Sequence, residues 1–415
     1  MDKKWLPTLI CGISLGCMGC GDSSPGGPSA PTAGSGGSAG GGPAGGSSTG
    51  GQAKGGSANG GAGSGGMAGG GMASGGTTAG GGAGSGGAPT GGSSGSGGAA
   101  GGGGAAGGTS AVVPSKGCSV MDGAKTLTTG GMSVMNALPT STRLTIMSGG
   151  MSRDYIVDIP ANYDPKKPHR LIFSWHQAFG SNTGNANGQH PAEDGLNFDA
   201  ENYAYFGLHR EATAANQPVI FVAPGGIGNL PWDFNRDVAL FDALLERINA
   251  NLCIDEKRVF STGFSYGAMM SYSLSITRQA KLRAVVAMAP ANYNLPGQPT
   301  DSKGVPIAYM GVTGMSDGQC PWVKDDTLKH GGKYCALTHA EDNGCTSAAN
   351  IPTAMVGSKQ HVCYDFEGCM AGYPVRVCTF DGAHTPSSIN DGSSTEDDGL
   401  KAFIPSLAWK FIAQF

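Results

Sequence analysis

Gly263-Phe264-Ser265-Tyr266-Gly267 is the stretch that decides the fold of this 415-residue chain. Its pattern is Gly-x-Ser-x-Gly, preceded by the strand-like Arg258–Thr262 and followed by the helix-like Ala268–Leu274. A serine at such a strand-to-helix turn is presented as a nucleophile, and the flanking glycines let the helix and strand approach closely. The alternative is a glycine-rich turn that serves only packing.

Apolar segments of strand length alternate with helical segments around this turn. The segment from Asp237 to Leu252 has helical spacing, with Leu240, Phe241, Leu244, Leu245 and Ile248 on one face. The expected strands are 155–160 (an edge strand), 171–175, 219–224, 258–262, 284–288, 307–310 and 375–380, and 409–412 is expected to belong to a closing helix. This alternation predicts an α/β protein of the α/β-hydrolase fold, with a mostly parallel sheet covered by helices on both faces.

Composition divides the chain into three parts. Residues 1–20 carry Lys3 and Lys4 before an apolar run too short to span a membrane, which predicts an export signal. Gly19-Cys20 resembles a bacterial lipoprotein signal, so Cys20 is the expected lipidation site, with Cys17 and ordinary secretion as alternatives. We therefore expect an exported protein, either a cell-surface or outer-membrane lipoprotein or a secreted one, whose membrane contact is limited to that anchor.

The other two parts differ in their ability to form a core. Residues 21–112 are rich in Gly, Ser and Ala and cannot bury enough apolar surface to fold, so a disordered linker is predicted. Residues 113–415 are long enough for one large core, which would be the catalytic domain. The net charge of −4 and the absence of a basic cluster argue against nucleic-acid binding, and we expect a monomer.

Eight of the 11 cysteines follow residue 112, and an even number in an exported chain favours disulfides. Cys363 and Cys378 are expected to face each other across a hairpin whose loop is 368–374. The pairs that would then follow are Cys345–Cys369, Cys320–Cys335 and Cys118–Cys253. The alternative is a zinc site at Cys335, His339 and Cys345, but the spacing is loose and no metal is expected.

A serine nucleophile needs a base and a group that orients the base. His384 follows the expected strand 375–380, where this fold presents its base, whereas His330, His339 and His361 lie in a polar stretch and are expected to face water. Asp317 follows the strand after the serine and is the expected acid. Its rivals Asp325 and Asp326 lie deeper in an insertion, and Asp381 is interpreted as a turn-former.

The oxyanion of an ester-hydrolysis intermediate needs preorganised N–H donors. The Tyr266 N–H is one expected donor, and the second is the N–H of Gln177 or Ala178 in the loop after strand 171–175. His176 is expected to end that strand. Trp232 could stack on an aromatic acyl group or pack in the interior, and the sequence leaves both open.

Several stretches resemble secreted feruloyl esterases of the polyhydroxybutyrate depolymerase-like group and carbohydrate esterase family 1. They are Arg170–His176, Ser261–Gly267, Met270–Leu274, Gly372–Val375, Phe380–Pro386 and Trp409–Phe415. The resemblance implies an α/β-hydrolase with a triad of Ser265, Asp317 and His384, no cofactor, and ferulate esters of plant-wall polysaccharide as substrate. Alternatives are an acetylxylan esterase, a short-chain polyhydroxyalkanoate depolymerase or a non-catalytic surface carbohydrate-binding protein.

The sequence departs from this family at two positions. Gln177 stands where the family has the glycine of His-Gly, and Thr313 stands where it has a histidine before the acid. Tannase-like relatives flank the serine and histidine with cysteines, and Phe264, Ala383 and Thr385 take those places here. The sequence therefore favours the feruloyl esterases over the tannase-like subgroup.

Overall fold

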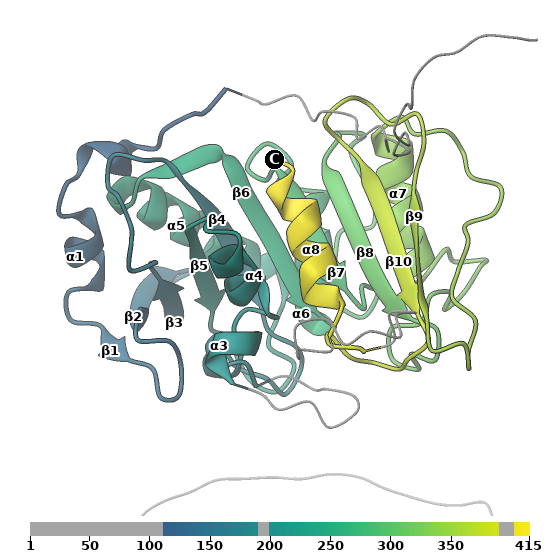
Figure 1. Cartoon of the computed structure of the whole chain (residues 1–415), viewed down its shortest axis with the longest axis horizontal. Coiled ribbons are helices and arrows are strands. Elements are labelled where there is room, and N and C mark those ends of the chain that lie inside the picture. Colours follow the sequence, from purple (N-terminus) through teal and green to yellow (C-terminus); the bar gives the residue numbers. More distant parts are fainter. Residues whose placement is uncertain (1–110, 190–198, 390–401) are drawn as a thin grey trace, which may run out of the picture. The chain divides into compact units, whose positions relative to one another are not determined.

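The computed structural model describes residues 111–189, 199–389 and 402–415 (Figure 1). The predicted export signal with Cys17 and Cys20, and all but the last two residues of the predicted linker, lie outside these ranges. Within them, no helix combines the length and the hydrophobicity that a bilayer crossing requires.

The described strands form one mixed sheet in the order β1-β2-β3-β5-β4-β6-β7-β8-β10-β9. The strands are β1 (Met132–Ser133), β2 (Ser141–Ser148), β3 (Met151–Asp158), β4 (His169–Trp175), β5 (Val219–Pro224), β6 (Ile254–Phe264), β7 (Ala284–Met288), β8 (Ala308–Gly314), β9 (His361–Asp365) and β10 (Val375–Phe380). The six strands from β5 to β10 in this order run parallel, and antiparallel strands flank them on both sides. The predicted α/β-hydrolase architecture is confirmed.

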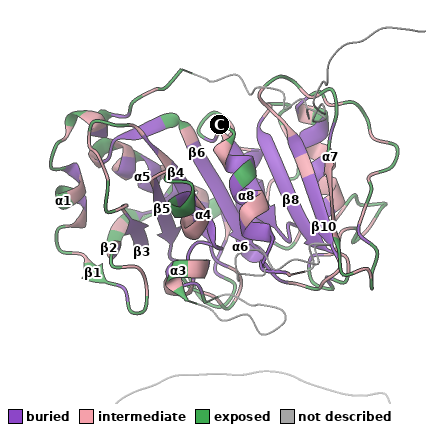
Figure 2. Cartoon of the chain, viewed as in Figure 1, coloured by how far each residue is buried: buried purple, intermediate pink, exposed green. Residues whose placement is uncertain are grey.

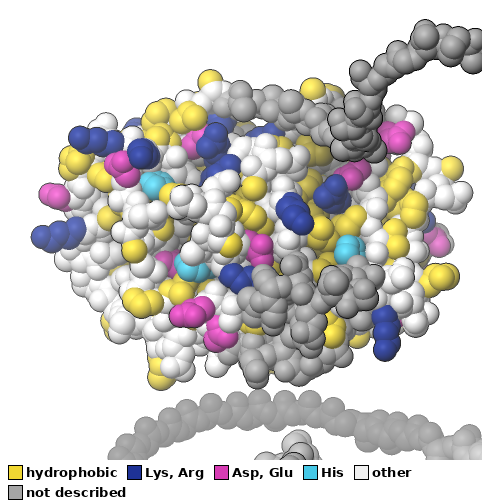
Figure 3. All heavy atoms as spheres, in the orientation of Figure 1, with side chains coloured by type: hydrophobic (Ala, Val, Ile, Leu, Met, Phe, Trp, Pro, Cys, Tyr) yellow, Lys and Arg dark blue, Asp and Glu magenta, His cyan; other side chains and the backbone are white. Residues whose placement is uncertain are grey.

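Helices cover both faces of the sheet. They are α1 (Gly123–Thr128), α2 (Asn182–Ala186), α3 (Ala200–Tyr203), α4 (Leu208–Ala214), α5 (Phe234–Asn251), α6 (Tyr266–Ser275), α7 (Gly332–Asp342) and α8 (Ile404–Ala413), with a 3-10 turn, η1, at Lys116–Ser119. In Figure 1, α4 and α8 lie in front of the sheet, and α5, α6 and α7 lie behind it. Basic and acidic side chains are interspersed on the front face rather than gathered in one basic patch (Figure 3).

The core lies between these layers, as the purple strands in Figure 2 show. β5, β7 and β8 are buried along their whole lengths, as expected for parallel strands covered on both faces. The five apolar side chains predicted to form the inner face of α5 are all buried. Burying one such side chain contributes about 1.5–3 kcal/mol to folding.

The strand predicted at the edge is an interior one. β3 pairs with β2 on one side and β5 on the other, and Tyr155 is fully buried. Strand β2 was not predicted, because Ser141–Ser148 is mostly polar. The β2–β3 hairpin turns at Gly149 and Gly150, whose φ values of 57° and 76° suit glycine.

Three of the four predicted disulfides are present, namely Cys118–Cys253, Cys345–Cys369 and Cys363–Cys378. The last joins residues directly opposite each other on β9 and β10, as predicted. The predicted pair Cys320–Cys335 is wrong, because both side chains are buried free thiols, one in the turn after β8 and one on α7. That pair was assigned by elimination, without a register to constrain it. The alternative zinc site is also wrong, because Cys345 is bonded to Cys369.

Candidate active site

The turn between β6 and α6 holds Ser265 in the conformation that the sequence predicted. Its φ of 56° and ψ of −119° are strained for a residue with a side chain, at a cost of about 1–3 kcal/mol. Its N–H donates to the Met288 carbonyl of β7 at 2.9 Å. A Cβ atom at Gly263 would lie 2.4 Å from the Gly267 backbone, and one at Gly267 would lie 2.0 Å from the Trp175 oxygen. Both glycines are therefore required by close backbone contacts.

Ser265, His384 and Asp317 form a continuous hydrogen-bonded chain. His384 Nε2 lies 2.9 Å from Ser265 Oγ, and His384 Nδ1 lies 2.7 Å from Asp317 Oδ2. The three residues come from the carboxyl ends of β6, β10 and β8, which parallel pairing brings to one edge of the sheet. An imidazole held in this way can accept the serine proton at Nε2 while its Nδ1 proton stays directed at the carboxylate.

Backbone groups fix the carboxylate of Asp317. Its Oδ1 accepts the N–H groups of Gln319 and Cys320, both at 2.8 Å, which leaves Oδ2 for the imidazole. The rival acids have other contacts, since Asp325 accepts the Leu328 N–H and Asp326 accepts the Tyr334 hydroxyl. The carboxylate is therefore oriented before any substrate binds.

Asp381 and the remaining histidines lie apart from this chain. Asp381 accepts the Lys359 N–H, in keeping with a turn-forming role. The prediction that His339 faces water is wrong, because its ring is fully buried against Tyr309 and lies 2.9 Å from the Ser275 hydroxyl. That burial lowers the pKa of His339 to about 3.

The first turn of α6 abuts the loop after β4, which is where the sequence places the oxyanion donors. The space that a Gly267 Cβ would need is occupied by the carbonyls of Trp175 and His176. Tyr266 is the first residue of α6, so its N–H is one of the helix N-terminal amides without an intrahelical acceptor. The Gln177 side chain folds back over Gly180, where a Cβ would come within 2.9 Å of it. A glycine three residues later thus makes room for the glutamine.

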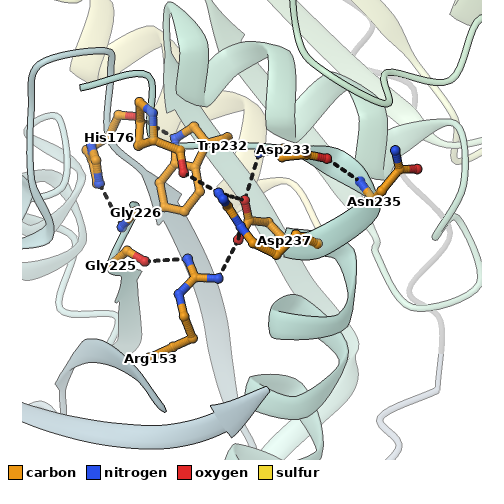
Figure 4. Close-up of polar contacts among 10 residues, drawn as sticks. Arg153, His176, Gly225, Gly226, Trp232, Asp233, Asn235 and Asp237 are labelled. Carbon is orange, nitrogen blue, oxygen red and sulfur yellow. Dashed lines mark hydrogen bonds and ion pairs between the residues drawn. The ribbon is translucent and has the colours of Figure 1, made fainter. Parts of the chain in front are cut away.

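The loop is anchored through His176 (Figure 4). His176 Nδ1 donates to the Gln177 carbonyl at 2.9 Å, and Nε2 accepts the Gly226 N–H at 3.2 Å. These contacts use the neutral ring, and burial lowers the pKa of His176 to about 4. The Trp232 Nε1–H donates to the His176 carbonyl at 2.8 Å.

Trp232 belongs to the interior of the protein. Its side chain is 1% exposed and packs edge-to-face on Trp175, with the ring centroids 5.0 Å apart. The interpretation of Trp232 as a platform for an aromatic acyl group is therefore wrong, because no face of the ring is open to a ligand. The packing alternative is correct.

A buried ion pair that was not predicted from the sequence lies beneath this loop. Arg153 Nη1 lies 2.6 Å from Asp237 Oδ1, and Arg153 Nη2 donates to the Gly225 carbonyl at 2.7 Å. Asp237 Oδ2 accepts the Asp233 N–H and the Arg236 guanidinium at 2.8 and 2.7 Å. Figure 4 shows these contacts surrounding Asp237 at the start of α5. The sequence carries no clear signal for this pair, because β3 contains Ser152, Asp154 and Asp158 as well as Arg153.

Comparisons with known proteins find relatives of this chain by sequence. No family model matches the chain. Feruloyl esterase C of Emericella nidulans is 34% identical over 261 residues, covering 62% of this chain and 83% of that protein. Feruloyl esterase D of Neurospora crassa is 31% identical over 309 residues, covering 74% and 92%.

Solved structures give a more distant likeness. A ferulic acid esterase aligns over 66% of this chain and 98% of its own, with a TM-score of 0.41 and 13% identity. The carbohydrate esterase family 1 ferulic acid esterase of Anaeromyces mucronatus, solved with ferulic acid, aligns over 50% and 85%, with a TM-score of 0.36 and 16% identity. The two sequence relatives carry the assignment: this chain belongs to the feruloyl esterase family and is a serine carboxylic-ester hydrolase of the α/β-hydrolase fold.

Proposed function

We propose that Ser265 is the nucleophile of this esterase, His384 its general base and Asp317 the group that orients the base. Ser265 Oγ attacks the ester carbonyl while His384 Nε2 takes its proton, and the protonated imidazole then donates that proton to the leaving alcohol. Water, activated by the same nitrogen, releases the acid from the acyl-enzyme. The observation that carries this proposal is the hydrogen-bonded chain of 2.9 and 2.7 Å.

The proposed oxyanion hole consists of backbone N–H groups. Tyr266 supplies one and the loop after β4 supplies the other, from Gln177 or Ala178. Support comes from the close contact of Gly267 with the end of β4, which brings the two backbones together. Removing one such donor from an esterase costs about 10²–10³ in kcat.

The proposed substrate is a hydroxycinnamate ester, chiefly of ferulate, on plant cell-wall polysaccharide. The names of the relatives support the ferulate part, and the sequence resemblance supports the polymer. We further propose that the enzyme acts outside the cell after export, with a lipid on Cys20 or Cys17. The three disulfides support an oxidising compartment.

The test is hydrolysis of methyl ferulate, 4-nitrophenyl acetate and a short hydroxybutyrate oligomer by the wild type and by Ser265→Ala. We expect methyl ferulate to be preferred and Ser265→Ala to abolish turnover of every substrate. Ser316→Ala, an exposed serine next to Asp317, is the matched control and should keep full activity. Near-full turnover by Ser265→Ala would refute the proposed mechanism, and a preference for acetate or hydroxybutyrate would refute the substrate.

A separate labelling experiment tests the anchor. Cells expressing the full chain are fed radiolabelled palmitate, and we expect label in the wild type that Cys20→Ala removes. Loss of label in Cys17→Ala alone would move the site to Cys17, and an unlabelled wild type would favour ordinary secretion.

A further inference from the structure

A cavity of about 680 Å³ lies against α7 and is used by no step of the proposed reaction. Its lining comes from α6, the loops after β7, β8 and β9, one face of α7 and the segment after that helix. Ser265, His384 and Asp317 are not among its lining residues. The volume falls within the range of small-molecule sites, so the cavity is large enough for part of a substrate.

The lining of the cavity is connected by hydrogen bonds to the turn that holds Asp317. Asn292 lines the cavity, and the neighbouring Tyr293 donates its hydroxyl to the Gln319 carbonyl at 3.2 Å. Gln319 in turn donates its N–H to Asp317 Oδ1. Two hydrogen bonds therefore connect Tyr293, the neighbour of a lining residue, to the carboxylate of Asp317, so the cavity lies close to the proposed active site.

The same part of the lining is held rigidly. The Asn292 amide donates to the Lys329 carbonyl at 2.9 Å and accepts the Gly331 N–H at 3.1 Å, which joins the loops after β7 and β8. The His330 ring packs against Tyr293 with the centroids 5.3 Å apart. A site with a fixed wall loses little entropy when a ligand binds.

The chemistry of the lining suits a neutral, polyhydroxylated ligand. Tyr334, Thr338 and Glu341 project from one face of α7, and hydroxyl and amide groups from the surrounding loops complete the wall. The charged groups Lys329 and Glu341 are of opposite sign, so the cavity has no cationic cluster for an anion. The half-buried Tyr334 ring, which has Lys333 Nζ 5.3 Å from its centroid, lines the cavity and supplies an apolar surface for a sugar ring, with polar groups beside it.

We propose that this cavity is a binding subsite for the carbohydrate that carries the ester, so that the enzyme recognises the sugar chain as well as the acyl group. This inference rests on the proposed function. It requires the polysaccharide substrate to gain affinity from contacts that a small methyl ester cannot make.

The experiment compares two substrates in the full-length enzyme: methyl ferulate and a feruloylated arabinoxylan oligosaccharide. Tyr334→Ala should lower kcat/KM for the oligosaccharide about fivefold, mainly through KM, and leave methyl ferulate within about twofold. Tyr334→Phe keeps the ring and should behave like the wild type. Tyr373→Ala, which replaces a half-buried tyrosine outside the cavity, is the control and should affect both substrates equally.

Equal losses on both substrates in Tyr334→Ala, or no loss on either, would overturn the proposal. Calorimetric titration with the unesterified arabinoxylan oligosaccharide tests the subsite independently of the proposed esterase activity, because binding needs no hydrolysis. Binding that weakens in Tyr334→Ala supports the subsite even if the wild type hydrolyses neither ferulate ester. The absence of binding to the wild-type protein rejects it.

Discussion

The two sides of Ser265 place their groups by different means. On the acid–base side, the turns after β8 and β10 bring Asp317 and His384 into direct contact with each other and with the serine. On the donor side, the proposed N–H donor is Gln177 or Ala178, in a loop whose position depends on the neutral ring of His176 and the ion pair beneath it. Substitutions on the acid–base side should therefore lower kcat directly. Substitutions on the donor side should lower the stability of the protein and reduce kcat only indirectly.

Among substitutions on the two sides of Ser265, the largest effect on activity is expected from Asp317→Asn. The asparagine oxygen can still accept the two backbone N–H groups, but its NH₂ then faces His384 Nδ1 and favours the wrong imidazole tautomer. We expect kcat for methyl ferulate to fall by about 10³–10⁴ with little change in stability. The matched control is Asp381→Asn, which lies near His384 in sequence and should keep its activity within about twofold.

Breaking the buried ion pair should have the largest effect on stability. Asp237→Asn leaves the Arg153 guanidinium buried without its anion, so the free energy of unfolding should fall by about 3–5 kcal/mol. The control is Asp242→Asn on the same helix, whose partly exposed partners Arg278 and Lys281 make its loss worth about 1 kcal/mol or less. Denaturant titration measures both, and equal losses would contradict the special role given to Asp237.

The candidate residues of the acid–base side were easier to find in the sequence because their signals are local. Ser265 lies in a five-residue motif, and His384 directly follows a recognisable strand. The donor side depends on contacts between residues far apart in the chain, such as Arg153 with Asp237, 84 positions away. No periodicity or motif encodes such a pair, and Arg153 lies between the polar residues Ser152 and Asp154, so the sequence does not mark it as buried.

The same limit explains the errors. Cys363 and Cys378 could be paired because a hairpin fixes their register, whereas Cys320 and Cys335 belong to a turn and a helix whose packing is set by the whole domain. His339 lies in a polar stretch, yet the helix α7 turns its ring inward. Composition describes the segment, but burial depends on which face of a helix meets the sheet.

The contribution of the donor side to the stability of the protein should also decrease in acid. Above pH 6.5, His176 is neutral in the folded and the unfolded chain and does not affect the pH dependence. Below pH 6.5 the unfolded chain binds a proton, but the folded chain does not until about pH 4, because burial lowers the pKa of His176. The free energy of unfolding should therefore fall by about 3 kcal/mol for this residue alone as the pH is lowered from 6.5 to about 4.

In the variant His176→Asn, the free energy of unfolding should depend less steeply on pH between about pH 4 and 6.5. The number of protons taken up on unfolding should be smaller by up to one. His330→Asn, at a half-buried histidine, is the control. Because His169, His209 and His339 also have lowered pKa values from burial, some slope should remain in the variant. NMR titration of the His176 ring gives a direct check, and a midpoint near pH 6.5 in the folded protein would contradict this account.

The smallest effect is expected from Trp232→Phe, and it separates the two roles considered for this side chain. Phenylalanine keeps most of the packing against Trp175 but removes the N–H that donates to the His176 carbonyl. One lost hydrogen bond to a buried carbonyl is worth about 1 kcal/mol, so kcat should fall about fivefold as the donor loop loosens. Since the ring does not contact substrate, the loss should be the same for methyl ferulate and 4-nitrophenyl acetate, with KM unchanged for both. A rise in KM confined to the ferulate ester would show that the indole contacts the aromatic acyl group after all, and the two sides of Ser265 would then differ less than their hydrogen bonds indicate.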